Sequence, residues 1–215
     1  MSADEPHVDW HRAAIDACVA TIADHADDLT ELDAAIGDGD HGTNLKRGFD
    51  AVAWEADALA NQPTGQMLQR AGTTLANKVG GASGALYGSL LMMMGKQLGQ
   101  RALDPETLVE ALGQGIEMVK KRGRAEVGEK TLLDVLVPVY REFACAVSDG
   151  ERAPDNLARR LHARAEEGLE STRAMTATKG RASYLGTRSA GHLDPGAKST
   201  CLLIGALASL AEGRP

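Results

Sequence analysis

The pattern that most constrains this chain is a succession of amphipathic, helix-forming segments with no convincing strand among them. In the first segment, apolar residues fall at Ile15, Val19 and Ile22, which is the spacing of one helix face. Aromatic residues make up only 3% of the chain and hydrophobic residues 43%, so small aliphatic side chains must fill the core. Such a composition favours close-packed helices over sheets, which prefer aromatic and β-branched residues. We therefore predict an all-α fold.

Capping residues and helix breakers divide the chain into eight expected helices. Thr64 and Asp104-Pro105 are start signals, and Pro138 inside a helix predicts a kink or the loss of one hydrogen bond. Most connections are short, so consecutive helices should run antiparallel within one domain over residues 1–215. The predicted ranges are about 8–29, 43–59, 65–78, 85–98, 105–121, 132–147, 154–176 and 199–210.

Four connections are unusual because they are rich in glycine and polar residues: 33–42, 80–84, 123–130 and 179–198. Long loops in a compact domain are more often functional than idle. In an up-and-down bundle, alternate connections lie at the same end, and these four follow the first, third, fifth and seventh helices. We expect them to form one site.

Residues 32–44, with the sequence LDAAIGDGDHGTN, place Asp33, Asp38 and Asp40 among three glycines. One such aspartate would indicate a turn or a helix cap, whereas three within eight residues favour a metal site. A calcium EF-hand is excluded because the twelfth position counted from Asp38 is not glutamate, and zinc prefers His and Cys ligands. Residues 37–42 also spell a dinucleotide-binding pattern, but carboxylates would repel a pyrophosphate unless a divalent cation lay between them. The working hypothesis is a magnesium-bridged nucleotide site.

Several polar residues of these loops have two interpretations each. His41 and Asn44 are candidates for phosphate contacts or for caps. The GGASG stretch at 80–84, with the Ser83 hydroxyl, is a candidate phosphate site before a helix or a place of close helix packing. Arg181 is either a cation over the nucleotide or a solvated surface residue. The residues alone do not decide between these alternatives.

Two further stretches are also candidates for the site. Residues 191–199 nearly match a P-loop, but the spacing is one residue too long and no strand precedes it, so a P-loop is excluded. Asp134 either approaches the site or lies near a helix N-terminus, where a carboxylate is favourable by ~0.3–1 kcal/mol. Tyr87 is expected in the core.

Charge and cysteine content limit the partners and the compartment. The net charge is −7 and no long basic run occurs, which argues against nucleic acid. Cys18, Cys145 and Cys201 are scattered, as free thiols in a reducing cytoplasm would be. The N-terminal residues 1–6 do not resemble a signal peptide, and no apolar run is long enough to cross a membrane.

Four stretches together carry a resemblance to a known family. They are LDAAIGDGDHGTN (32–44), GGASGALYG (80–88), RGRAEVGEKTLLDV (122–135) and KGRASYLGTRSAGHLDPGAKS (179–199). In these the chain resembles the nucleotide-binding L subunit of bacterial dihydroxyacetone kinase. The resemblance implies an up-and-down antiparallel barrel of eight helices, with the nucleotide site in the loops at one end.

The resemblance also implies functional residues. It implies that Asp33, Asp38 and Asp40 hold two Mg²⁺ ions that bridge the phosphates of ADP or ATP. The implied nucleotide contacts are His41, Gly42, Thr43, Asn44, Ala82, Ser83, Gly123, Leu132, Arg181, Asp194, Pro195 and Gly196. Leu132 replaces a methionine found in relatives, a change that an apolar contact to the base should tolerate.

The implied activity is that of a phosphotransferase subunit in the cytoplasm. In the stand-alone form of the family, bound ADP is rephosphorylated by a phosphohistidine protein, the M subunit of the phosphotransferase system. The phosphoryl group then passes to dihydroxyacetone held on a K subunit. The alternatives are an ATP-exchanging kinase subunit for another small keto sugar and a nucleotide-loaded protein that binds a transcription regulator. The chain has no substrate domain, which favours the stand-alone form.

Overall fold

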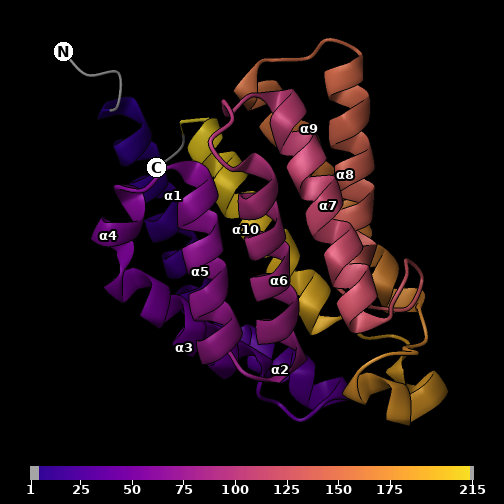
Figure 1. The fold of residues 1–215 in the computed structure, drawn as a ribbon. Helices are drawn as coiled ribbons and strands as arrows, with labels where there is room; N and C mark the ends of the chain where they lie inside the picture. The colour runs from indigo at the N-terminus through magenta and orange to yellow at the C-terminus, as the bar shows by residue number, and fades with distance from the viewer. Residues whose placement is uncertain (1–4, 214–215) are drawn as a thin grey trace.

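The computed structural model describes residues 5–213 and is all-helical within that range (Figure 1). Two short 3₁₀ helices, η1 and η2, accompany the α-helices. The elements are α1 (Glu5–Asp24), α2 (Ala26–Ile36), α3 (His41–Trp54), α4 (Ala56–Ala60), α5 (Thr64–Lys78), α6 (Gly81–Leu98), α7 (Pro105–Gly123), α8 (Leu133–Ser148), α9 (Pro154–Ser171), η1 (Thr172–Ala174), η2 (Arg181–Ser189) and α10 (Pro195–Ala211).

The eight predicted helices correspond to eight rods, two of which are interrupted at one residue. His25 separates α1 from α2, but its N–H donates to the Thr21 carbonyl and its own carbonyl accepts from Leu29. Glu55 separates α3 from α4 in the same way, since the N–H of Leu59 donates to its carbonyl. The hydrogen bonds therefore continue past each interruption, and the predicted all-α class is confirmed.

The contacts between rods close into a ring. The rod that begins with α1 packs against both α3 and α10, and α3 also packs against α5. From α5 to α10, each helix packs against the next one in the chain. This order is consistent with the predicted barrel, in which alternate connections between rods lie at the same end.

Helices α5 and α6 approach so closely that their backbones touch. A Cβ atom added at Gly65 would lie 2.4 Å from the Gly99 carbonyl oxygen, and one added at Gly88 would lie 2.7 Å from the Gly72 carbonyl oxygen. Real side chains do not tolerate such distances, so glycine is required at these crossings. The two helices therefore pack closely along their length.

Three predicted boundaries differ from the structure for local reasons. The first rod extends to Ile36, so Asp33 lies on a helix instead of in a loop. Helix α6 begins at Gly81, not at about residue 85, since Gly80 and Gly81 adopt positive φ and start it early. Helix α10 begins at Pro195, not at Ser199, because the Asp194 carboxylate accepts from the Ala197 N–H and caps it.

Two other predicted segments also differ. The helix expected over 154–176 ends at Ser171 and continues only as η1. The loop expected over 179–198 contains η2, which is broken at Gly186 by a positive φ.

Other expectations concern the thiols, the membrane and the terminus. Cys18, Cys145 and Cys201 are free, as predicted. None of the helices in the described range is long and apolar enough to cross a membrane. The prediction about a signal peptide rests partly on residues 1–4, which lie outside the described residues.

Candidate functional site

One cleft of about 470 Å³ lies at the end of the molecule where α2 ends and α3, α6 and α10 begin. In Figure 1 this is the lower end, where α2 meets the 181–189 segment. All four glycine-rich connections contribute to its walls, as the loop argument predicted. Of the predicted site residues, those that line it are Asp33, Asp38, Asp40, His41, Asn44, Ala82, Ser83, Gly123, Leu132, Arg181, Asp194, Pro195 and Gly196.

Two predicted contacts, Gly42 and Thr43, are not part of the cleft wall. A Cβ atom at Gly42 would lie 1.8 Å from the Ala26 carbonyl oxygen, so this glycine allows α3 to cross α2. The Thr43 hydroxyl donates to the Asp40 carbonyl at 3.0 Å. Both residues therefore have a structural role in the turn that carries Asp40 and His41.

The three predicted metal ligands lie together. Asp33, Asp38 and Asp40 each offer a carboxylate oxygen, and these oxygens all lie within 4.8 Å of one another. Asp33 lies in the last turn of α2, and its carboxylate accepts from the N–H groups of Asp40 at 2.9 Å and His41 at 3.2 Å. The residues 37–40 are thereby folded back onto α2, with Gly39 at positive φ.

The chemistry of this carboxylate group fits a hard divalent cation. Clustered carboxylates repel one another unless a positive charge lies nearby, and oxygen ligands of this kind suit Mg²⁺. The Arg181 Nε atom lies 3.0 Å from Asp38 Oδ2 and supplies part of that charge. Both side chains are partly exposed, so this ion pair is weak and exchangeable.

His41 lies in a buried chain of hydrogen bonds. Its Nδ1 atom lies 3.1 Å from the Ser83 hydroxyl and its Nε2 atom lies 2.9 Å from the Ser199 hydroxyl. The Tyr87 hydroxyl continues the chain to Ser199 and Thr200, at 2.8 Å each. Burial lowers the pKa of His41, against the opposing effect of Asp33 and Asp40. The neutral imidazole therefore joins α3, α6 and α10 beneath the cleft.

Sequence reasoning did not find Tyr87 and Ser199 as supports of the site. Tyr87 is buried as predicted, but its hydroxyl has polar partners and is more than core filling. No local spacing signal joins residues so far apart in the chain, and only the fold brings the Tyr87 hydroxyl of α6 to Ser199 of α10.

The N-terminus of α6 faces the cleft without a side-chain cap. Gly81, Ala82 and Ser83 line the wall, and no side chain accepts a hydrogen bond from the first turn. Uncapped N–H groups at a helix start form a natural anion site. Asn44 lies on the neighbouring wall, and its side-chain oxygen accepts from Arg47 at 2.7 Å.

Asp134 resolves one of the open alternatives. Its carboxylate is buried and accepts from the Gly128 N–H at 2.5 Å and from the Thr131 N–H at 2.7 Å. It is not part of the cleft lining. Asp134 therefore holds the 123–131 loop in place, and Leu132, which follows that loop, contributes to an apolar part of the cleft with Leu86 and Val119.

Asp194 combines a capping role with an unusual environment. It caps α10 and lines the cleft, and desolvation of its partly buried carboxyl group raises its pKa to about 7. The capping hydrogen bond from Ala197 and the nearby Lys130 oppose that rise.

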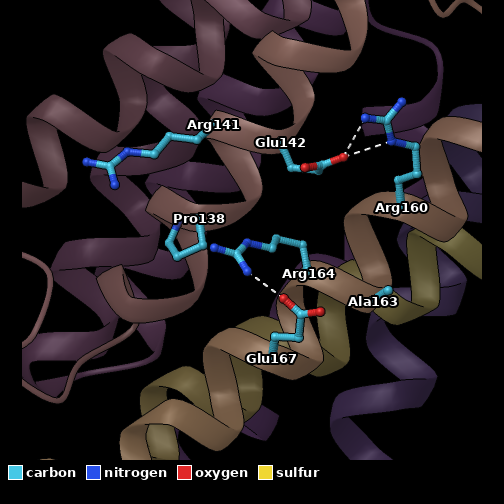
Figure 2. Close-up of a pocket in the computed structure, with 7 residues that line it drawn as sticks. All are labelled: Pro138, Arg141, Glu142, Arg160, Ala163, Arg164 and Glu167. Atoms are coloured by element: carbon cyan, nitrogen blue, oxygen red, sulfur yellow. Dashed lines mark hydrogen bonds and ion pairs between the residues drawn. The ribbon is translucent and has the colours of Figure 1, made fainter.

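A second groove, between α8 and α9, differs in its chemistry (Figure 2). Arg160 pairs with Glu142 at 2.7 Å and Arg164 pairs with Glu167, so most of its charges are neutralised. It has a volume of about 420 Å³ and contains no residue of the glycine-rich connections. The predicted site residues therefore converge on the first cleft alone.

Comparison with known proteins shows the family of the chain. A model of the DAK2 domain matches residues 35–209, which include Asp38, Asp40 and most of α10. The chain belongs to the DAK2 domain family. Within the DAK2 match lie all the predicted site residues except Asp33.

Two relatives of similar length are both named as ADP-binding subunits of PEP-dependent dihydroxyacetone kinases. The ADP-binding subunit DhaL of PEP-dependent dihydroxyacetone kinase 1 from Listeria innocua is 41% identical over 179 residues, which cover 83% of this chain and 84% of the relative. The corresponding Escherichia coli subunit is 39% identical over 196 residues, which cover 91% of this chain and 93% of the relative.

A solved structure shows the same fold within a longer chain. The crystal structure of the dihydroxyacetone kinase from C. freundii in complex with AMP-PNP and Mg²⁺ matches with a TM-score of 0.72 at 25% identity. The match covers 97% of this DAK2 chain but only 34% of the kinase. The chain thus spans about a third of that protein.

Proposed function

We propose that this DAK2 protein is the nucleotide-binding subunit of a phosphoenolpyruvate-dependent dihydroxyacetone kinase. The observation that carries the proposal is the group of three carboxylates, Asp33, Asp38 and Asp40, which shares one cleft with the uncapped N-terminus of α6. A cation site beside an anion site fits a magnesium–nucleotide complex. The names of the Listeria and Escherichia coli relatives support the same reading.

The roles of the residues follow from their positions. Asp33, Asp38 and Asp40 would hold two Mg²⁺ ions, and Ala82 and Ser83 would bind phosphate oxygens through the first turn of α6. The remaining nucleotide contacts from the walls would be His41, Asn44, Gly123, Leu132, Arg181, Asp194, Pro195 and Gly196. Gly42 and Thr43 would act through the turn that they shape, since they lie outside the wall.

The chain's own residues would bind and orient the nucleotide more than they would exchange protons. When bound, the magnesium ions would offset charge on the phosphoryl oxygens during in-line transfer. Arg181 would move from Asp38 toward the phosphates, and Leu132 and Leu86 would exclude water from the base. His41 has both ring nitrogens engaged by serine hydroxyls, so it would act as a fixed, neutral support.

The stand-alone form is favoured over a fused kinase. The two DhaL relatives are 41% and 39% identical to this chain, compared with 25% for the C. freundii kinase. We therefore propose a single-domain cytoplasmic subunit whose ADP is rephosphorylated by a phosphohistidine protein. Its phosphoryl group would then pass to dihydroxyacetone on a separate K subunit.

Native mass spectrometry of the purified protein tests the proposal, with Asp38→Asn as the variant. The parent should carry ADP with two Mg²⁺ ions, and Asp38→Asn should lose Mg²⁺-dependent nucleotide retention while its helical circular dichroism stays unchanged. Asp50→Asn is the matched control, since Asp50 lies on the exposed face of α3 in an ion pair with Lys46. A parent protein with no affinity for ADP or ATP, or an Asp38→Asn variant with full retention, would refute the proposal.

A further inference from the structure

Lys130 has the largest fully buried side chain in the described part of the molecule, with 1% of its surface exposed. It ends the 123–130 connection in a left-handed conformation, at φ 61°. No carboxylate of the described residues lies within ion-pair distance of its ammonium group. A buried cation without a direct ion pair is costly to maintain, which indicates that it serves a purpose.

The ammonium group instead donates to two main-chain carbonyls. It lies 2.6 Å from the Thr172 oxygen, at the end of α9, and also binds the His192 oxygen. Burial lowers the pKa of Lys130, while Asp194 and Asp134 act in the opposite direction. Lys130 thus joins two segments that lie far from it, and from each other, in the sequence.

The segment that it holds leads directly into the cleft wall. Residues 191–194 are also joined to the end of α9 by the Gly191 N–H, which donates to the Arg173 carbonyl at 2.7 Å, and by the Asp194 N–H, which donates to the Thr172 hydroxyl at 3.1 Å. Asp194 then caps α10. The position of this wall therefore depends on one small set of hydrogen bonds, in which Lys130 is the only charged donor.

The opposite side of Lys130 is also part of the site. Lys130 and the next residues, Thr131 and Leu132, line the cleft, and the buried Asp134 carboxylate accepts a hydrogen bond from the Thr131 N–H. The distance between the 131–132 wall and the 194–196 wall is therefore set through Lys130. A cleft of about 470 Å³ between them must match a ligand closely to hold it.

We propose that Lys130 is a positioning residue, whose hydrogen bonds to the Thr172 and His192 carbonyls hold the two walls of the cleft at the separation required for tight nucleotide binding. The proposal rests on the proposed function, since it names a residue that sets the affinity of that same site. It attributes the effect of Lys130 on affinity to the position of residues 191–194. That position can be tested in the protein without nucleotide.

The experiment compares Lys130→Met with the parent, both stripped of nucleotide. Titration calorimetry with ADP and Mg²⁺ should give an affinity lowered by about tenfold or more, as for residues that orient a binding group through another. Hydrogen exchange in the nucleotide-free proteins should be faster at the Gly191 and Asp194 amides, also by about tenfold. Leu59→Ala is the control, because Leu59 is a buried core residue of α4, away from the cleft. It should lower stability and leave both the ADP affinity and those two exchange rates unchanged.

A second variant keeps the proposal open to refutation if Lys130→Met does not fold. Thr172→Val removes the hydroxyl that accepts from the Asp194 N–H but keeps the shape of the side chain. It should speed exchange at Asp194 and weaken ADP binding. Unchanged ADP affinity in the folded variants would overturn the proposal, as would weaker binding with unchanged exchange at residues 191 and 194, because Lys130 would then act on the nucleotide directly. A parent that does not bind ADP would refute the proposed function instead, while the exchange rates would still test the role of Lys130.

Discussion

Gly168 of α9 packs against the main-chain oxygen of Asp134 in α8. In a regular helix this oxygen would accept a hydrogen bond from the N–H of residue 138, which here is Pro138. Proline has no N–H, so this carbonyl lacks its usual intrahelical partner. A Cβ atom at position 168 would lie 2.6 Å from that oxygen. The hydrogen bond that Pro138 removes from α8 is thus lost at the carbonyl where α9 approaches closely.

Gly168→Ala should therefore destabilise the protein. The added methyl group meets main-chain atoms that cannot rotate away, and overpacking of this kind costs about 1–3 kcal/mol. The measurement is the free energy of unfolding in urea. Glu166→Ala, at an exposed position of the same helix, should change it by less than about 0.5 kcal/mol. Equal effects of the two substitutions would contradict the contact.

Ser199→Ala should destabilise the protein through the buried hydrogen-bond chain. It removes the partner of His41 Nε2, whereas the Tyr87 hydroxyl keeps Thr200 and the Gly196 carbonyl. A buried polar atom left without a partner costs about 1–3 kcal/mol. Thermal and urea unfolding measure the loss, and Ser148→Ala at the exposed end of α8 is the control. A variant as stable as the parent would show that water replaces the hydroxyl without cost.

Arg181→Gln should change the affinities for metal and nucleotide in opposite directions. In the free protein Arg181 pairs with Asp38, so its removal should strengthen the binding of Mg²⁺ alone by a few-fold, the range of an exposed pair. The binding of ADP with Mg²⁺ should weaken, because a cation for the phosphates is lost. Titration calorimetry of both ligands measures the effects, with Arg188→Gln in the same segment as control. Changes of the same sign in the affinities for Mg²⁺ and for ADP would show that Arg181 does not move from Asp38 to the phosphates.

Asp194→Asn should change how stability depends on pH in the nucleotide-free protein. The pKa of Asp194 is about 7 in the folded protein and about 3.9 in an unfolded chain. Between these values the folded state keeps a proton that the unfolded state has released, so the free energy of unfolding falls as the pH rises. Asparagine does not titrate and still caps the helix. The variant should therefore gain stability relative to the parent between about pH 5 and about pH 8, measured by urea unfolding. A difference that is independent of pH would contradict the raised pKa.

The order of helices and the end that carries the site could be predicted from the sequence because both depend on local signals. Apolar spacing, prolines and glycine-rich connections located the rods, and alternation of the connections placed four loops together. The predicted helix over 199–210 starts later than α10, which begins at Pro195. The Asp194-Pro195 pair was the better signal, since it repeats the arrangement that was recognised at Asp104-Pro105.

The supports of the site could not be predicted in the same way. Lys130, Tyr87 and Ser199 act through partners that are distant in the sequence, and burial of a lysine is not visible in its own neighbourhood. The resemblance implies a nucleotide contact at Gly42, and in the structure the backbone of this glycine also lies against α2. A glycine in a motif can be required by a ligand or by a helix crossing, and only the fold distinguishes them.

The close packing of α5 on α6 has a consequence for the entropy of binding. The turn at Gly80 and Gly81 joins the two helices whose backbones touch, so the first turn of α6 has little freedom to lose when a ligand binds there. The 181–189 segment has only Ser189 fully buried and leaves 87% of Tyr184 exposed, so it has more freedom to lose. Most of the entropy lost when the cleft closes should therefore come from ordering the 181–189 segment. Ligands that do not reach this segment should bind with a smaller entropic penalty.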